Sequence, residues 1–303
     1  MPGGLFEIDD YLGWKLTEGK KAIHHSRYFE ATYRINALGY RDRPRNLFKE
    51  AKNYRILLYG DSQIFGWGIP AEQRFSNLIE AQNPHLEMWN LAVPGYGLDQ
   101  EALSYEKEGQ LLNADEVIFI VSGATLHRTR YDYIYRKYKP IFVINKNDSL
   151  RLVRVQQRTN AWTRLFYRVL SPLYLPYFVD RRFAMLKRTN KQAGDAPDQK
   201  TTVGSDAIGE LEKKIIERVR NVARERKHRM TIIADLPKTS VEDLKNFCVQ
   251  RQIGFLQIVL SKNDPDLMFG KHDRHWNPRA HKLITEQLQS QLETKFRPAV
   301  EYE

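Results

Sequence analysis

The chain has 303 residues, of which 42% are hydrophobic and 28% charged, a balance typical of a folded protein and not of a disordered one. Its single cysteine, Cys248, excludes an internal disulfide, and no apolar run reaches the length of about 18 to 20 residues that spans a bilayer. The first residues also lack the basic-then-apolar pattern of a signal peptide, so we expect a soluble protein with one large domain.

The first part of the chain, residues 1–50, contains turn signals and short alternating stretches. This pattern predicts an extension of strands and loops that packs on the periphery of the core. We expect the core itself to occupy residues 51–298.

Within the core, apolar strand patterns alternate with amphipathic helix patterns. Strands are predicted at residues 54–60, 86–93, 115–123, 229–237 and 254–260. Helices are predicted at residues 71–82, 98–112, 206–228, 240–252 and 277–293. Apolar strands separated by such helices indicate a parallel sheet that is covered on both faces. The expected fold is therefore α/β, a flavodoxin-like three-layer α/β/α sandwich with about five parallel strands, and its site should lie at the carboxyl ends of the strands.

A basic and aromatic insertion interrupts this alternation at about residues 126–204. Residues 126–191 hold sixteen Lys and Arg against three acids, a local excess that is larger than the net charge of +11 of the whole chain. The apolar stretch 160–179 predicts either a buried helix or a lid or membrane-surface segment, and residues 190–206 predict a mobile loop. The insertion suits an anionic surface or membrane, whereas nucleic acid is disfavoured because no nucleic-acid motif is present.

The segment directly after the first core strand contains Asp61, Ser62 and Gln63. At this place the hydroxyl and the backbone N–H of Ser62 would face the ligand crevice, at the start of a helix that stabilises negative charge. Taken alone, a serine before a helix is more often a cap than a nucleophile.

A second polar cluster immediately precedes the last helix. It contains Asp273 and His275, which supply the acid and the base that a catalytic serine needs. Two alternatives are that His275 caps the helix, or that His272, Asp273, His275 and His281 bind a metal. A metal requires at least three converging ligands, and we expect neither a metal nor a cofactor.

Together these segments resemble the SGNH/GDSL hydrolases. The stretch YGDSQIFGWG is similar to the first block of the family, which implies that Ser62 is the nucleophile and that its N–H belongs to the oxyanion hole. The stretch NLAVPGYGLDQ is similar to the second block, which implies that the N–H of Gly95 is the other oxyanion donor, although Gly95 alone indicates only a tight turn. The stretch DRHWNPRAH is similar to the last block and implies that Asp273 orients His275 as base. Upstream, YRINALGYRD resembles a lead-in found in one bacterial branch of the family.

The third block departs from the family pattern. Where the family has Gly-x-Asn-Asp, this chain reads SGATLHR, with Ala124 at the asparagine position and Thr125 at the aspartate position. Loss of such an oxyanion donor typically costs about 2.7 to 4 kcal/mol, which slows catalysis without abolishing it. The hydroxyl of Thr125 and the ring of His127 are the candidate substitutes.

Two functions remain open at this point. The resemblance implies a serine-dependent carboxyl-ester hydrolase or O-acyltransferase that acts on acyl, chiefly acetyl, esters of a glycan or lipid. The alternative is a catalytically impaired module that binds an anionic polysaccharide, membrane surface or protein complex, as the altered third block suggests. The missing signal peptide favours the cytoplasm and the resemblance favours the outside of it, so the compartment is open as well. Cys248 is expected to be a core residue and not a nucleophile.

Overall fold

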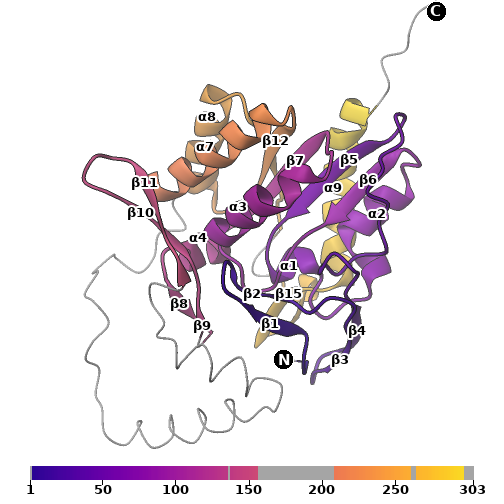
Figure 1. Cartoon of the computed structure of the whole chain (residues 1–303). Helices are drawn as coiled ribbons and strands as arrows, with labels where there is room; N and C mark the ends of the chain where they lie inside the picture. The colour runs from indigo at the N-terminus through magenta and orange to yellow at the C-terminus, as the bar shows by residue number, and fades with distance from the viewer. Residues whose placement is uncertain (1, 136, 156–207, 261–263, 297–303) are drawn as a thin grey trace, which may run out of the picture.

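The computed structural model describes residues 2–135, 137–155, 208–260 and 264–296 (Figure 1). The apolar stretch 160–179 and the loop 190–206, for which the sequence predicts a helix or lid and a mobile connection, lie outside the described residues. None of the helices in the described ranges is long and apolar enough to cross a membrane.

The centre of the molecule is a sheet of five parallel strands, as predicted. Its strands are β5 (Tyr54–Tyr59), β6 (Leu86–Asn90), β7 (Glu116–Ser122), β12 (Arg229–Asp235) and β13 (Gly254–Gln257). Their order across the sheet is β13-β12-β7-β5-β6, and all four pairings are parallel. This is the flavodoxin-like order, in which the direction of winding reverses between β5 and β7. A ligand crevice is therefore expected outside the carboxyl ends of these two strands.

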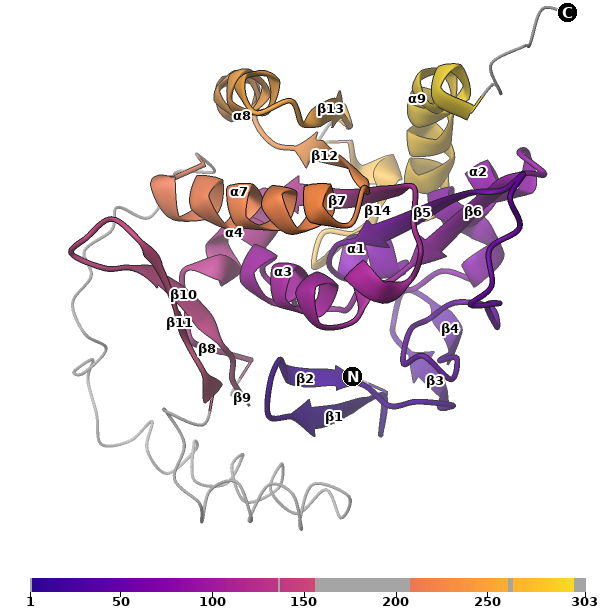
Figure 2. The ribbon, with the colours of Figure 1, turned by 45° about the horizontal axis from the view of Figure 1, so that its top comes forward.

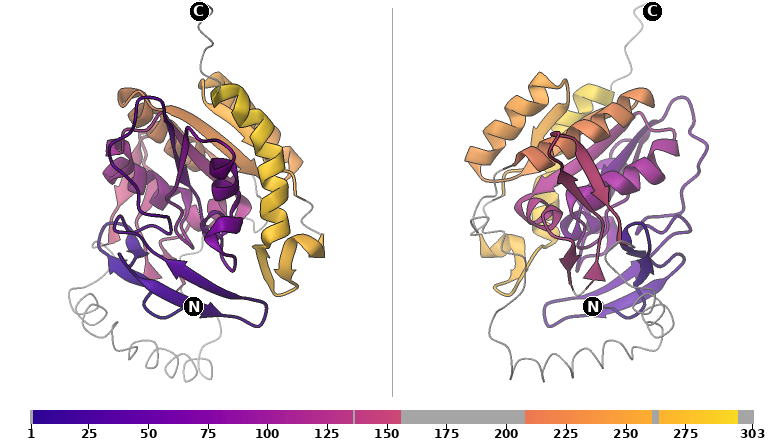
Figure 3. Two further views of the ribbon diagram at one scale, coloured as in Figure 1. Left: turned by 90° about the vertical axis from the view of Figure 1, so that its right-hand side faces the viewer. Right: turned by 60° about the vertical axis from the view of Figure 1, so that its left-hand side comes forward.

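Helices cover both faces of the sheet and complete the three-layer sandwich (Figures 2 and 3). The larger ones are α2 (Phe75–Ala81), α3 (Leu98–Lys107), α7 (Glu210–Glu225), α8 (Lys238–Gln250) and α9 (Pro278–Phe296). Helix α2 contacts α9, α3 contacts α7, and an ion pair of 3.1 Å from Lys213 to Asp243 joins α7 to α8. With right-handed crossovers, α2 and α9 form one outer layer and α3, α7 and α8 form the other.

Several predicted helices are shorter in the structure. The helix predicted from residue 71 begins at Phe75, because Arg74 is extended and only a short 3-10 helix, Ala71–Gln73, precedes it. The helix predicted to reach residue 112 ends at Lys107, where Glu108 leaves the helical region and a 3-10 helix, Gly109–Leu111, follows. A third 3-10 helix, Pro265–Leu267, lies before α9.

The N-terminal extension consists of two hairpins, β1 (Phe6–Asp9) with β2 (Gly13–Leu16), and β3 (Lys21–His25) with β4 (Glu30–Arg34). It is less peripheral than its sequence suggests. The indole N–H of Trp14 donates to the Pro94 carbonyl at 3.2 Å, and the Tyr96 hydroxyl donates to the Trp14 carbonyl at 2.6 Å. The Tyr33 hydroxyl accepts from the Gly68 N–H at 2.9 Å. The extension therefore braces the turns that follow the first two core strands.

The described part of the basic insertion contains two further hairpins. They are β8 (Tyr133–Ile134) with β9 (Lys137–Tyr138), and β10 (Ile141–Ile144) with β11 (Leu150–Val153). The ammonium of Lys139 forms a fully buried ion pair with Asp99 at the start of α3. This pair attaches the insertion to the core beside the carboxyl ends of the strands.

Candidate active site

The turn after β5 places Ser62 at the first position of a four-residue helix, α1 (Ser62–Phe65). Asp61 is its N-cap and accepts the Gln63 N–H at 2.9 Å. Gly66 ends the helix with φ 77°, a left-handed conformation that glycine adopts without strain. Ser62 itself is half-buried and follows the carboxyl end of β5, the neighbour of β7 in the sheet.

A chain of hydrogen bonds joins Ser62, His275 and Asp273. The last two residues belong to β15 (Asp273–Trp276), which forms a hairpin with β14 (Met268–Gly270). Strand β15 lies beside α1 (Figure 1). Ser62 Oγ lies 2.9 Å from His275 Nε2, and His275 Nδ1 lies 2.7 Å from Asp273 Oδ1. The hydrogen bond with His275 holds the pKa of Asp273 below its usual range, which favours the carboxylate that orients the ring. This is the arrangement in which a histidine removes a proton from a serine.

Gln63 fixes the strand that carries the histidine. Its side-chain amide donates to the Arg274 carbonyl at 3.1 Å and accepts the Trp276 N–H at 2.8 Å. The two bonds lie on either side of His275 along the backbone. Gln63, which is adjacent to Ser62, thus fixes the position of the His275 ring relative to the Ser62 hydroxyl.

Two backbone N–H groups are available to stabilise an oxyanion. In the ranges that the structure describes, neither the N–H of Ser62 nor that of Gly95 donates to a protein acceptor. Gly95 has φ 86°, which L side chains rarely adopt. A Cβ at this position would lie 2.9 Å from Cε2 of Tyr135, an exposed side chain that can move aside, so it is the conformation of the turn that needs glycine.

Replacement of Gly95 by alanine is therefore expected to slow reaction with a serine-directed phosphonate, because the strained turn would move its N–H. The loss of one oxyanion donor corresponds to a factor of about 10² to 10³. The rate of modification of Ser62, followed by intact mass, checks this. Gly19→Ala is the matched control for backbone strain, since Gly19 also has positive φ (66°) but has no atom near its Cβ position. Equal rates for Gly95→Ala and wild type would contradict an oxyanion role.

The third block forms the start of α4 (Gly123–Thr129). Ala124 is exposed, and the buried hydroxyl of Thr125 lies 3.0 Å from Ser122 Oγ, the N-cap of this helix. His127 is exposed and its ring packs on Tyr131, with 4.8 Å between the ring centroids. Across the described residues, no hydrogen bond connects Thr125 or His127 to Ser62 or His275.

The residue that α4 contributes to the site is Arg128, which the sequence motifs do not single out. It is buried, its guanidinium forms an ion pair with Asp61, and its Nε donates to the Tyr96 carbonyl at 2.7 Å. Asp61 caps the helix of Ser62, and Tyr96 follows Gly95. Arg128 therefore holds together the two turns whose N–H groups face the crevice.

The buried acid Glu101, near this ion pair, does not compete with Asp61 for the charge of Arg128. Burial raises the pKa of Glu101 well above its usual range, and the neighbouring Asp61 charge raises it further. In the part of the chain that the structure describes, neither carboxyl oxygen of Glu101 has a hydrogen-bond partner. A protonated Glu101 leaves the positive charge of Arg128 to Asp61.

An aromatic wall lies beside His275. The Trp67 ring centroid is 5.7 Å from that of His275 and 4.7 Å from that of His24, and Phe29 packs on Phe269 at 4.7 Å. Burial lowers the pKa of His24, which favours its neutral ring. The wall combines residues from the N-terminal extension with residues of the core, and it offers an apolar surface next to the base.

The metal alternative finds no geometric basis in the described part of the chain, where no three His, Cys, Asp or Glu side chains converge. His272 is exposed, while His281 is buried in α9 and accepts the Phe75 N–H at 3.3 Å. Burial lowers the pKa of His281 to about 3. The neutral His281 thus serves the packing of α9 against α2.

Cys248 is expected to resist alkylation in the folded protein. It is fully buried in α8, and burial raises the pKa of its thiol to about 12, so hardly any reactive thiolate exists near pH 8. Intact mass after treatment with iodoacetamide should show no adduct under native conditions and one adduct in denaturant. Fast native alkylation would mean that α8 opens readily.

Comparison with known proteins finds similarity to solved structures alone. No family model matches the sequence, and no curated protein matches it either. Similar solved structures include a lipolytic protein of the G-D-S-L family from Veillonella parvula, with 11% identity, 78% of this chain and 97% of that chain covered, and a TM-score of 0.42. A psychrotrophic esterase from a Pseudoalteromonas species has 8% identity, coverage of 80% and 98%, and a TM-score of 0.45. A GDSL-like lipase from Bacteroides thetaiotaomicron has 9% identity, coverage of 82% and 92%, and a TM-score of 0.42.

These identities and TM-scores carry no activity or substrate over to this chain. The central sheet, the order of its strands and its helical layers are observed in the structure of this chain itself. Members of the GDSL family, which the motifs around Ser62 and His275 resemble, are thus among the solved structures to which this chain is similar.

Proposed function

We propose that the protein is a serine-dependent carboxyl-ester hydrolase. The observation that carries this proposal is the hydrogen-bonded chain from Ser62 Oγ through His275 to Asp273, with distances of 2.9 and 2.7 Å, at an accessible sheet edge. Two unengaged N–H groups, of Ser62 and Gly95, support it. The fold alone would not support the proposal, because the same three-layer sandwich occurs in proteins with many different functions.

In the proposed reaction Ser62 Oγ attacks the ester carbonyl while His275 Nε2 takes the hydroxyl proton. The N–H groups of Ser62 and Gly95 stabilise the oxyanion, and His275 returns the proton to the departing alcohol. The acyl group is then transferred to water. Transfer to the hydroxyl of a second molecule instead of water would make the protein an O-acyltransferase by the same chemistry.

The proposed substrate is an acyl ester, chiefly an acetyl ester, of a glycan or lipid. The wall of Trp67, Phe29 and Phe269 offers an apolar surface to one side of His275. After α4, three tyrosines expose about half of their surface: Tyr131 (49%), Tyr133 (49%) and Tyr135 (53%). Flat rings with polar edges suit the alcohol portion of a bulky ester.

Release of p-nitrophenol from acetate, butyrate and decanoate esters tests the proposal, with release of acetate from O-acetylated polysaccharide as the test of the glycan. We expect wild-type protein to turn over at least one ester and Ser62→Ala to lose that turnover. The control is Ser26→Ala, which alters a serine of the N-terminal extension and should retain turnover. Ser205 is unsuitable as a control because it lies outside the described residues. Equal turnover by wild type and Ser62→Ala would overturn the proposal.

A second candidate, an impaired module that binds an anionic polysaccharide, membrane surface or protein complex through residues 126–191, is favoured by one observation. Ala124 replaces the amide donor of the third block, and the Thr125 hydroxyl is engaged by Ser122. Salt-sensitive binding of an acidic polysaccharide that persists in Ser62→Ala, together with no ester turnover by wild type, supports this candidate over the first.

A further inference from the structure

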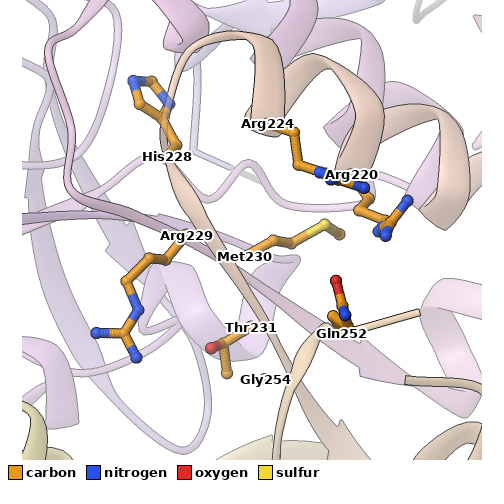
Figure 4. A pocket seen from close by; sticks show the side chains of 8 residues that line it. All are labelled: Arg220, Arg224, His228, Arg229, Met230, Thr231, Gln252 and Gly254. Atoms are coloured by element: carbon orange, nitrogen blue, oxygen red, sulfur yellow. The ribbon is translucent and has the colours of Figure 1, made fainter. Parts of the chain in front are cut away.

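A cavity of about 290 Å³ lies at the end of the sheet opposite to Ser62 (Figure 4). It is lined by residues from the end of α7 and from the amino ends of β12 and β13, namely Arg220, Arg224, His228, Arg229, Met230, Thr231, Gln252 and Gly254. Ser62 follows the carboxyl end of β5 in the same parallel sheet. The cavity therefore cannot be part of the crevice proposed for the ester.

The charged side chains that line this cavity are all basic. Three of its eight lining residues are arginines, and no Asp or Glu lines it. Arg220 and Arg224 are four residues apart on α7, so their side chains lie on the same face of the helix, as Figure 4 shows. Arg229 is the first residue of β12 and extends on the other side of that strand from Met230.

Three arginines near the cavity have partners elsewhere. Arg218 forms an ion pair with Glu106, Arg226 donates to Gln110, and Arg251 forms an ion pair with Glu217.

The buried carboxylate nearest to Arg229 along the β12–β7 ladder is that of Glu116, which accepts hydrogen bonds from the hydroxyls of Thr231 and Tyr54. No carboxylate in the described part of the chain forms a salt bridge with Arg220, Arg224 or Arg229.

One of these guanidinium groups has a donor that is both buried and unsatisfied. Within the described ranges, the Nε of Arg220 has no hydrogen-bond partner, and its Nη1 makes only a long contact of 3.4 Å with Asn221. An anion in the cavity would neutralise Arg220 and Arg224, whose side chains lie on the same face of α7.

We propose that the cavity binds a compact ligand that carries a phosphate group. A planar guanidinium presents paired N–H donors that match the oxygens of phosphate, and two of them one helical turn apart can contact one dianion. The volume is close to the lower limit of about 300 Å³ for small-molecule pockets, which suits a phosphate monoester or pyrophosphate better than a large ligand. Met230 supplies an apolar wall and Gln252 supplies an amide, and both can contact the part of the ligand other than its phosphate group.

The test is calorimetric titration of the whole chain with pyrophosphate and with glucose 6-phosphate, in buffer of constant ionic strength set with sodium chloride. We expect saturable binding of one or both, and a loss of affinity of about tenfold or more in Arg220→Gln/Arg224→Gln. The single variant Arg220→Lys keeps the charge but loses the paired donors, so it should bind more weakly than wild type. Citrate serves as a carboxylate anion of similar charge, and its equal affinity would overturn the assignment to phosphate.

The controls separate this site from the proposed active site. Arg279→Gln removes an exposed arginine that is paired with Asp266 far from α7 in sequence, and it should bind like wild type. Ser62→Ala should also bind like wild type, whatever its effect on esters. Unchanged affinity in the double variant, with circular dichroism showing an intact fold, would overturn the proposal, as would the absence of binding by wild type.

Discussion

Replacement of His275 by alanine is expected to lower kcat/KM for an ester by a factor of about 10⁴ to 10⁶, because the serine hydroxyl then has no base. The structure places His275 Nε2 2.9 Å from Ser62 Oγ, within the range in which the ring can accept the proton directly. Asp273→Asn is expected to cost about 10⁴, since an amide at 2.7 Å from Nδ1 favours the wrong tautomer of the ring. Steady-state kinetics on the ester that wild type turns over best measure both losses.

The matched control for His275→Ala is His272→Ala, which removes an exposed histidine three residues earlier in the same hairpin. Its kcat/KM should stay within a factor of about two of wild type, because a solvated side chain without such contacts contributes little. A His275→Ala variant that retains most of its activity would show that another group activates Ser62. Equal losses in His272→Ala and His275→Ala would point to a disturbed hairpin instead of a lost base.

Replacement of Arg128 by methionine is expected to destabilise the fold by about 3 to 5 kcal/mol. The exposed fractions of the Arg128 and Asp61 side chains are 7% and 4%, so removal of the arginine leaves a carboxylate buried without its counterion. The same change releases the Tyr96 carbonyl and with it the turn of Gly95. Urea denaturation measures the stability, and the rate of phosphonate modification of Ser62 measures the site.

Two further variants separate the buried charge from the loss of side-chain volume. Asp61→Asn/Arg128→Met retains a residue that can cap α1 and leaves no charge buried, so it should be more stable than Arg128→Met alone. Arg279→Met breaks an exposed Arg–Asp pair, with 62% and 68% of the side chains exposed, and should cost no more than about 1 kcal/mol. Similar losses in Arg128→Met and Arg279→Met would contradict the bracing role of Arg128.

The sheet was predictable because its signal is local. Each strand of the core is a mainly apolar run followed by a turn, and all five runs lie in the sheet. The position of Ser62 after the first run and of His275 before the last helix followed from the same pattern. Their approach to 2.9 Å depends on the tertiary fold, and the resemblance of the motifs supplied that expectation.

The third block shows where local patterns fail. The sequence directed attention to Ala124, Thr125 and His127, which occupy or adjoin the positions of the missing donor. The side chain that reaches the site is Arg128, one residue further along α4, where it is buried against Asp61. An arginine in a short helix resembles a solvated residue in sequence, and only the approach of the turn at Asp61 reveals its partner.

The N-terminal extension was underestimated for the same reason. Short alternating stretches predict hairpins, but they do not say that Trp14 and Tyr33 are buried against the turns after β5 and β6. Arg41 provides a further example, since its guanidinium donates to the carbonyls of Phe65 and Gly66 at 2.9 and 2.6 Å. The stretch YRINALGYRD is thus part of the support of the nucleophile turn.

The central claim is that Ser62 is an activated nucleophile, and modification by a fluorophosphonate probe, followed by intact mass and peptide mapping, tests it most directly. We predict one adduct per chain, located on Ser62, that forms in wild type and in His272→Ala and fails to form in Ser62→Ala and His275→Ala. Folded wild-type protein that acquires no adduct, or that acquires it equally fast in His275→Ala, would contradict the claim.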